Sequence, residues 1–403
     1  MNHIPAAPRG FTPTGRLHFG VNLVGPAADL TFEQLRGLAQ TAERGLFSLL
    51  TLDERYWLGD DPGASSSSDP AGSSDVAALQ AALAAVTGNI GLAVAAAPDY
   101  DDPASLVHRI ASLDKISGGR AAWNLLADGA RHGEANSGSA DHSQREEFLA
   151  AAQRIWDTWG AATDFSLPAR GPVETLGAFQ RDGQLFSVGV GALHQPGPRY
   201  RPVVIHAGDT LGDRRFGTRH ADVLTTAPAG ISQALALRKD IAASVMGAGR
   251  SANDVKILQG ATFILAETAG EAREKAEWLR GQLPQSAWDD QAFVGSYSGV
   301  ADLLLDFARS GAVDGFNVMP WLYPTELAEI VNHLVPELQE RGIYPTDYAA
   351  DSLRDILCLP GSARSAAAPT AHALPVIEVG DLNDIHLDLD LRMELIVQKM
   401  GAS

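Results

Sequence analysis

The stretch RPVVIHAGDTLGDRRFGTRHADVLTT, residues 201–226, holds one full unit of the pattern that decides the fold. Residues 202–206 form a short apolar run that predicts a buried strand, residues 210–219 predict a helix, and residues 222–226 predict a second strand. A strand, a helix and a second strand in this order give two parallel strands with the helix packed on one face of the sheet.

The same unit recurs along the chain. The predicted strands are residues 17–24, 46–52, 90–96, 120–126, 202–206, 222–226, 255–265 and 313–319. Helices are predicted at residues 31–44, 75–87, 103–116, 144–159, 210–219, 231–246, 270–283, 300–310 and 324–341. Eight such units are the number that closes a barrel, so we predict an α/β fold of the (β/α)₈ TIM-barrel type. An open doubly wound sheet is the alternative, because it has the same alternation, usually with about five to seven strands.

Two segments stand outside this alternation. Residues 161–201 have no clear period and are rich in Gly and Pro, which predicts an insertion after strand four with short hairpin strands. The last part of the chain begins Ala-, Pro- and Ser-rich and ends in an amphipathic stretch. We therefore predict a barrel over residues 1–358 and a C-terminal extension over residues 359–403.

Composition excludes several classes of protein. The 403 residues carry a formal net charge of −18, which would repel a phosphate backbone and argues against nucleic-acid binding. No apolar run reaches the length of about 18 residues that a membrane helix needs, and the N-terminus has no apolar segment typical of a secretory signal. The single cysteine, Cys358, excludes an internal disulfide or a cysteine cluster, and we expect it to be a half-buried core thiol. No histidine spacing is typical of a metal site. We expect a cytoplasmic protein.

Candidate functional residues follow from the barrel, because ligands bind at the carboxyl ends of its strands. Asp53 follows strand two and could accept hydrogen bonds from a ligand hydroxyl or ring N–H, or could instead cap a helix or pair with Arg55. Asn124 lies at the end of strand four. His142 lies in the following loop, where it is either a ligand contact or a solvated histidine. Trp321, after strand eight, is a candidate for the substrate pocket.

The loop between strand five and its helix, residues 206–210, is a candidate phosphate site. Free N–H groups at the start of a helix favour a phosphate, and Gly208 lets the backbone approach closely. Arg214 and Arg215 add positive charge. Asp209 acts against this interpretation unless its carboxylate turns away to cap the helix, so a capped junction without a ligand is the alternative.

Three segments together carry a family resemblance. SLDKISGGRAAWNLL (residues 112–126), the stretch at 201–226 and DGFNVMPWLYPTELAEIVNHLVPELQERG (residues 314–342) occur in that order. They resemble the bacterial-luciferase-like flavin monooxygenases, in particular the branch with nitrilotriacetate monooxygenase component A and the dibenzothiophene-sulfone and long-chain alkane monooxygenases. The resemblance covers roughly residues 17–353. It implies a (β/α)₈ barrel and a two-component system, in which a separate flavin reductase supplies reduced FMN and one oxygen atom of O₂ enters an organic substrate.

The resemblance also suggests which residues hold the flavin. Asp53 matches the family aspartate after strand two, near the flavin ring, and Asn124 matches the asparagine of a Trp-Asn motif. His142 matches the histidine of an Asp-His motif. Gly208 and Thr210 match the loop that holds the FMN phosphate. The flavin chemistry needs no acid or base from the protein, so we propose no catalytic side chain.

This chain departs from the family pattern at several hydroxyl-bearing positions. Residues 95–97 are all alanine where the family usually has Thr or Ser. Ala127 replaces a hydroxyl after the Trp-Asn motif, Glu146 stands where a tyrosine is usual, and Asp209 replaces the first hydroxyl of the phosphate loop, although its position still places it among the predicted cofactor contacts. Each lost hydroxyl removes a hydrogen bond of roughly 0.5–1.5 kcal/mol.

Three hypotheses follow from these observations. The first is an FMNH₂-dependent monooxygenase that acts on a small organic substrate, with a flavin reductase and O₂ as its partners, and we expect it to be a homodimer. The second is a barrel that has lost flavin chemistry and serves as a non-catalytic partner subunit or ligand-binding protein. The third keeps the barrel but uses a deazaflavin.

Overall fold

The computed structural model describes residues 16–23, 30–52, 75–96, 102–126, 142–161, 175–181, 184–189, 201–208, 210–282 and 291–361. The chain divides into two units, Met1–Ser362 and Ala363–Ser403, and every described residue belongs to the first unit. The predicted boundary after residue 358 remains a prediction.

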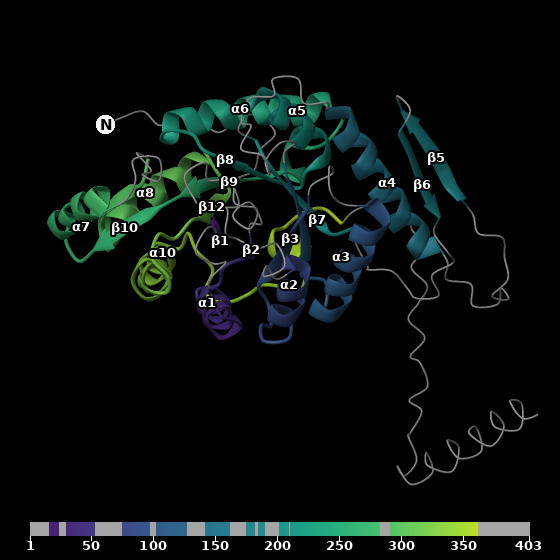
Figure 1. Cartoon of the computed structure of the whole chain (residues 1–403). Coiled ribbons are helices and arrows are strands. Elements are labelled where there is room, and N and C mark those ends of the chain that lie inside the picture. The colour runs from purple at the N-terminus through teal and green to yellow at the C-terminus, as the bar shows by residue number, and fades with distance from the viewer. Residues whose placement is uncertain are drawn as a thin grey trace, which may run out of the picture. The chain divides into compact units, whose positions relative to one another are not determined.

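Eight parallel strands form a closed barrel, as predicted (Figure 1). Around the barrel the order is β1, β2, β3, β4, β7, β8, β9 and β12, and β12 pairs with β1 to close the ring. The barrel strands are β1 His18–Leu23, β2 Leu49–Leu52, β3 Gly91–Ala96, β4 Ala121–Leu125, β7 Val203–Ala207, β8 Val223–Thr226, β9 Lys256–Ala261 and β12 Gly315–Val318. The closed ring excludes the open doubly wound sheet.

Helices separate the barrel strands and pack outside them (Figure 1). They are α1 Phe32–Arg44, α2 Val76–Ala84, α3 Pro103–Ser117, α4 His142–Ala161, α5 Leu211–His220, α6 Ile231–Gly247, α7 Ala269–Gln282, α8 Tyr297–Ser310, α9 Thr325–Glu329, α10 Val335–Glu340 and the single turn α11 Leu353–Ile356. Two short helical turns add to these, a 3₁₀ turn at Ala252–Asp254 and a π turn at Ile330–Leu334. The insertion after strand four contains the predicted hairpin, β5 Thr175–Arg181 with β6 Gln184–Gly189.

Local sequence explains where these helices begin and end. The Thr31 side chain accepts from the amide of Gln34 and the Gln34 side chain reaches back, which is a capping box at the start of α1. Asp102 caps α3, which has Pro103 in its first turn, and Gly118 ends it in the left-handed conformation at φ 72°. Strand β4 can therefore begin three residues later.

The strands divide the buried side chains into two cores. Outward-facing residues pack under the helices, with a cluster of aromatic rings that includes Phe19, Phe263 and Phe316. A second core lies inside the barrel. It consists of seven inward-facing strand residues together with three residues from the end of the described chain: Leu49, Ala93, Ala122, Val203, Ile205, Val223 and Leu258, with Leu353, Leu357 and Leu359. The turn α11 and the residues after it therefore plug the amino end of the barrel, which the sequence did not indicate.

Four sequence-based expectations differ from the structure. The strand predicted at 255–265 ends at Ala261, and after Thr262 the chain forms a separate strand, β10 Phe263–Ala266, which pairs with β11 Phe293–Ser296. Strand β11 was not predicted. The helix predicted at 324–341 is interrupted by the π turn, next to a proline in the first turn of α10 that has no N–H to donate. Cys358 is exposed, at φ 49°, and is not a core thiol.

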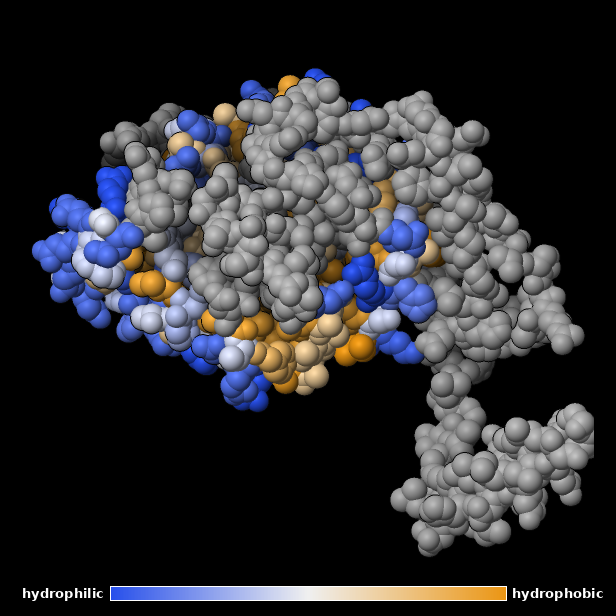
Figure 2. Space-filling model, viewed as in Figure 1, coloured by the Kyte–Doolittle hydropathy of each residue, from blue (hydrophilic) through white to orange (hydrophobic). Residues whose placement is uncertain are grey.

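Helix α2 presents an apolar outer face. Its sequence, VAALQAALA, has no charged residue, and Ala78, Ala82 and Ala85 form a partly or fully exposed stripe along it. Figure 2 shows hydrophobic residues gathered over this helix. A helix with so little polar surface is typical of one that packs against a partner.

Candidate functional site

A group of polar side chains faces the barrel interior at the carboxyl ends of the strands. Along each strand alternate residues point inward, so the buried inward residues of the second core fix which side chains share that face. Thr51, Asn124 and Thr225 each lie two positions beyond such a residue, and register pairs Asn22 with Thr51 and Asn317 with Gly260. The mouth is therefore polar above an apolar interior.

Two of these side chains have unsatisfied acceptors. The Oδ1 atoms of Asn22 and Asn317 are buried and have no hydrogen-bond partner among the residues that the structure describes. Buried polar atoms without a partner are rare, and each needs a water or a ligand group. Sequence reasoning found Asn124 but missed Asn22, Thr51 and Asn317. Their signal was a single polar residue at an inward position of an otherwise apolar strand.

Asn124 is brought to this mouth as predicted. It lies on β4, half-buried, in register with Ala95 of β3 on one side and Ile205 of β7 on the other. Ala95, one of the alanines that replace a family hydroxyl, is buried beside it and offers no hydrogen bond. The polar character of this part of the mouth therefore comes from the asparagine amide.

The loop from Gly208 to Thr210 also lies at the carboxyl end, between β7 and α5. The Gly208 amide donates to Thr225 O at 2.8 Å, which ties the loop to β8. Thr210 caps α5: its Oγ1 accepts from the Asp213 amide at 3.1 Å and donates to Asp213 Oδ2 at 2.5 Å. Since a hydroxyl has one proton, the Thr210 hydroxyl is committed to Asp213.

The first turn of α5 still offers donors to an anion. The amides of Leu211 and Gly212 precede the first intrahelical bond, and they have no acceptor in the described part of the chain. Arg214 reaches over the loop and donates to Gly208 O at 3.3 Å. Backbone amides and this cation, rather than hydroxyls, are what the loop can offer a phosphate.

A buried charged cluster supports this loop from behind. Arg145 of α4 and His206 of β7 are almost fully buried, and Arg145 Nη1 donates to Asp213 Oδ1 at 3.1 Å. Burial alone would raise the pKa of the Asp213 carboxyl, but its contacts with His206, Thr210 and Arg145 hold that pKa well below its usual range. Asp213 is therefore a carboxylate in the folded protein.

The remaining predicted residues are only partly covered by the structure. Asp53 and Asp209 lie outside the described residues. His142 is the first residue of α4, and its side chain lies outside the described atoms. Glu146, which stands where the family has a tyrosine, pairs with Arg219 of α5 at 3.2 Å and lies 3.8 Å from His220. That side chain joins α4 to α5 instead of serving the mouth.

The loop after β12 is fixed by a buried carboxyl group. Glu326 Oε2 accepts from the amides of Trp321 at 2.6 Å and Leu322 at 3.3 Å. Burial raises the pKa of Glu326 to about 7, although the two amides and Lys275 lower it. The position of Trp321, the predicted substrate-pocket residue, therefore depends on this side chain, which the sequence did not single out.

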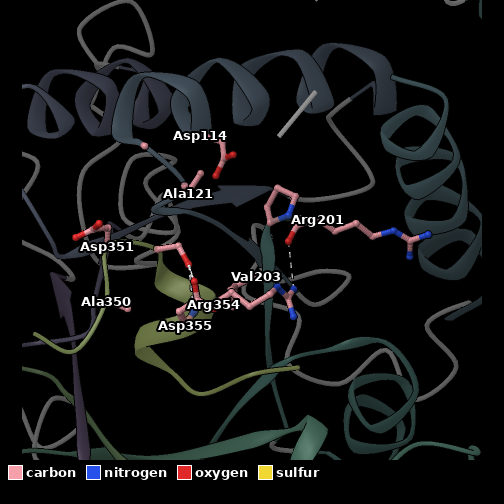
Figure 3. Close-up of a pocket in the computed structure, with 12 residues that line it drawn as sticks. Asp114, Ala121, Arg201, Val203, Ala350, Asp351, Arg354 and Asp355 are labelled. Atoms are coloured by element: carbon pink, nitrogen blue, oxygen red, sulfur yellow. Dashed lines mark hydrogen bonds between the residues drawn. The ribbon is translucent and has the colours of Figure 1, made fainter. Parts of the chain in front are cut away.

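A cavity of about 430 Å³ lies at the opposite end of the barrel (Figure 3). Its lining includes Ala121 and Val203, the first residues of β4 and β7, so it opens at the amino ends of the strands. Arg354 crosses this end and donates to Arg201 O at 3.2 Å. Burial raises the pKa of Asp114, at the cavity edge, to about 6. None of the predicted site residues that the structure describes lines this cavity.

Comparison with known proteins decides the family. The family model described as luciferase-like monooxygenase matches residues 14–306, which is more than half of the chain. The chain belongs to the luciferase-like monooxygenase family. Nitrilotriacetate monooxygenase component A from Aminobacter aminovorans is 28% identical over 364 residues, which cover 72% of this chain and 80% of that protein. Dibenzothiophene-sulfone monooxygenase from Rhodococcus erythropolis is 25% identical over 407 residues, covering 80% and 88%.

Solved structures agree on the fold of this luciferase-like chain. EDTA monooxygenase from Chelativorans sp. BNC1 superposes with a TM-score of 0.69 at 21% identity, over 86% of this chain and 99% of that one. The predictions of the family and of the TIM barrel are thus confirmed. Among the described residues no group of three or more His, Cys, Asp or Glu side chains is placed to hold a metal ion. No helix in the described ranges is long and apolar enough to cross a membrane.

Proposed function

We propose that this protein is the oxygenase component of a two-component monooxygenase, which takes reduced FMN from a separate flavin reductase and oxygenates a small organic substrate. Family membership supports the reaction class. The observation that supports a flavin cofactor is a pair of amide oxygens without hydrogen-bond partners in the described part of the chain, on Asn22 and Asn317. They lie at the same end of the barrel as the first turn of α5, whose amides are available to an anion.

The residues of the mouth fit a phosphorylated flavin. A flavin ring presents both N–H donors and carbonyl acceptors, which amide side chains such as those of Asn22, Asn124 and Asn317 can match. A phosphate suits the free amides at the start of α5, where Arg214 and the helix dipole add positive potential. A Cβ at position 208 would lie 3.3 Å from Arg214 Cγ, so the glycine lets the Arg214 side chain lie close to the loop backbone.

Each part of the mouth then has a separate task. Reduced FMN, when bound, supplies the electrons with which O₂ is split, so that one oxygen atom enters the substrate and the other leaves as water. The asparagine side chains orient the ring, and the α5 loop anchors the phosphate. The apolar interior under them, with Ile205 and Leu258, keeps water from the reacting face. Asp53, His142 and Asp209 are proposed as further contacts of the cofactor.

Binding of reduced FMN tests the proposal. We expect saturable anaerobic binding in the micromolar range, followed by flavin oxidation with O₂ when a reductase and NADH are supplied. Asn124→Leu removes the amide but keeps the volume, and it should weaken binding by about tenfold, equivalent to about 1.4 kcal/mol. Asn253→Leu, on an exposed turn at the other end of the barrel, is the matched control. Absence of saturable binding below about 1 mM would overturn the proposal.

A specific observation favours a second candidate, a barrel without flavin chemistry that serves as a partner subunit or binds another ligand. The Thr210 hydroxyl is held by Asp213, and the family hydroxyl before it is replaced by Asp209. Under this alternative the protein would bind neither FMN nor a deazaflavin, and it would be stable only when co-expressed with a sister subunit. A homodimer that oxidises reduced FMN excludes it.

A further inference from the structure

The buried cluster behind the α5 loop joins three elements of the barrel. Arg145 comes from α4, His206 from β7, and Asp213 from the first turn of α5. The Arg145 side chain is 1% exposed and that of Asp213 is 11% exposed. The Arg145 guanidinium also lies 5.3 Å from the ring centre of Phe216, which packs a cation against an aromatic face.

Hydrogen bonding orients the members of this cluster. His206 Nδ1 lies 2.7 Å from Leu125 O, and since a carbonyl only accepts, Nδ1 carries a proton. His206 Nε2 lies 3.3 Å from Arg145 Nη1 and 3.7 Å from Asp213 Oδ1. The Arg145 cation and the Asp213 carboxylate form an ion pair at 3.1 Å.

The cluster of Arg145, His206 and Asp213 adjoins the loop between β7 and α5. Asp213 holds the Thr210 hydroxyl, and His206 is two residues from Gly208. Through the carbonyl of Leu125 the cluster also touches the residue next to Asn124. Arg145 lies one turn after His142 on α4, so it fixes the start of the helix that carries that residue.

We propose that Arg145 is a positioning residue for the phosphate of the cofactor, a step that rests on the proposed function. Its cation neutralises Asp213, whose carboxylate lies in the same first turn that a phosphate would approach. Without Arg145, Asp213 would meet the phosphate as an uncompensated like charge, and the loop would lose the side chain that ties α5 to α4. The ring of the flavin would be affected far less than its phosphate.

The ratio of two affinities tests this proposal. Reduced FMN and reduced riboflavin share the ring and differ in the phosphate. The dissociation constant of riboflavin divided by that of FMN therefore measures what the phosphate contributes to binding. For Arg145→Met we expect this ratio to fall by about tenfold or more, with riboflavin binding within about twofold of the unchanged protein. The double variant Arg145→Met with Asp213→Asn restores the charge balance and should recover part of the ratio.

A matched control separates this effect from general loss of packing. Arg238 and Asp314 form another buried ion pair, with both side chains 3% exposed, at the amino end of the barrel. Arg238→Met should lower the free energy of unfolding and leave the riboflavin-to-FMN ratio of dissociation constants unchanged. If Arg145→Met does not fold, Arg145→Gln also removes the charge but keeps N–H donors, and it should still lower the ratio.

Each outcome bears on one claim. If Arg145→Met, or the Gln variant where Met does not fold, keeps the ratio of the unchanged protein, or lowers both affinities equally, the positioning role is refuted. The same holds if the double variant shows no recovery. If the unchanged protein binds neither flavin, the proposed function fails instead.

Discussion

Replacing Glu326 by glutamine changes how the stability of the barrel depends on pH. Glu326 is 6% exposed, its Oε2 accepts from two amides of the loop after β12, and its Oε1 has no partner among the described residues. Glutamine keeps a carbonyl oxygen for the amides and has no charge. E326Q therefore removes the ionisation of this buried group and keeps its role in the loop.

The size of this pH-dependent change in stability follows from the pKa of Glu326. Burial raises the pKa of Glu326 from 4.5 to about 7, so between these values the unfolded chain has lost a proton that the folded chain still binds. The stabilisation of the folded state is full below pH 4.5, decreases as pH rises, and is lost above about 7. At about 1.4 kcal/mol per pKa unit, the total loss is about 3 kcal/mol. E326Q avoids this loss, so its free energy of unfolding relative to the unchanged protein should rise by that amount between about pH 4.5 and 8.

Urea unfolding at about pH 4.5, 6, 7 and 8, followed by the fluorescence of buried tryptophans such as Trp123, measures this difference. Glu340→Gln is the control, because Glu340 is exposed and the same substitution there should shift stability by less than about 0.5 kcal/mol at every pH. If the stability curves of the unchanged protein and the E326Q variant stay parallel across this range, the carboxyl is not held protonated by burial and the reasoning is refuted.

Three further predictions concern the barrel and its surface. Leu353→Ala empties a fully buried position in the plug and should lower the free energy of unfolding by about 3 kcal/mol in urea titrations, with FMN affinity unchanged because the mouth is at the other end. Gly315→Ala would place a Cβ 1.9 Å from His18 O, where β12 closes on β1, so soluble, folded protein should be nearly absent by circular dichroism. Ala82→Glu puts a charge on the apolar face of α2 and should convert the expected homodimer to a monomer by light scattering.

Each of these changes has a control. Leu303→Ala removes a side chain that is already 42% exposed, and an equal loss at Leu303 and in the plug would contradict the packing argument. Gly247→Ala adds a Cβ that meets nothing within 4 Å and should fold normally. Ala243→Glu lies on an exposed face of α6, and an unchanged mass for both glutamate variants would show that α2 is not the dimer contact.

The strand order was predictable because parallel barrel strands are buried on both faces and therefore appear as short apolar runs between helices. Because of the same property, the sequence does not show where a strand leaves the barrel. Residues 255–265 form one apolar run, yet the chain passes from β9 to β10 at Thr262, since Phe263 belongs to the aromatic cluster outside the ring. Strand β11 and turn α11, each four residues long, were not predicted.

The candidate site was predictable only where position along a strand determines it. Asn124 and Gly208 follow from the rule that ligands bind at carboxyl ends, and the structure places both there. Arg145 and Asp213 were not predicted, because they are separated by 68 residues and meet only after α4 and α5 pack together. The exposure of Cys358 likewise depends on how the chain turns after α11.

The substituted phosphate loop has a physical explanation in that same cluster. The Thr210 hydroxyl donates its hydrogen bond to Asp213, so it cannot also donate one to a phosphate, which is the contact that the family pattern suggests. The bond instead fixes the first turn of α5, whose free amides and dipole favour an anion by about 0.3–1 kcal/mol in exposed settings. A fixed turn costs less ordering free energy on binding than a flexible one. The loss of side-chain hydroxyls therefore lowers the affinity for FMN, and the rigid support by Arg145 raises it. The affinity of the Arg145 variants for FMN measures the contribution of that support directly.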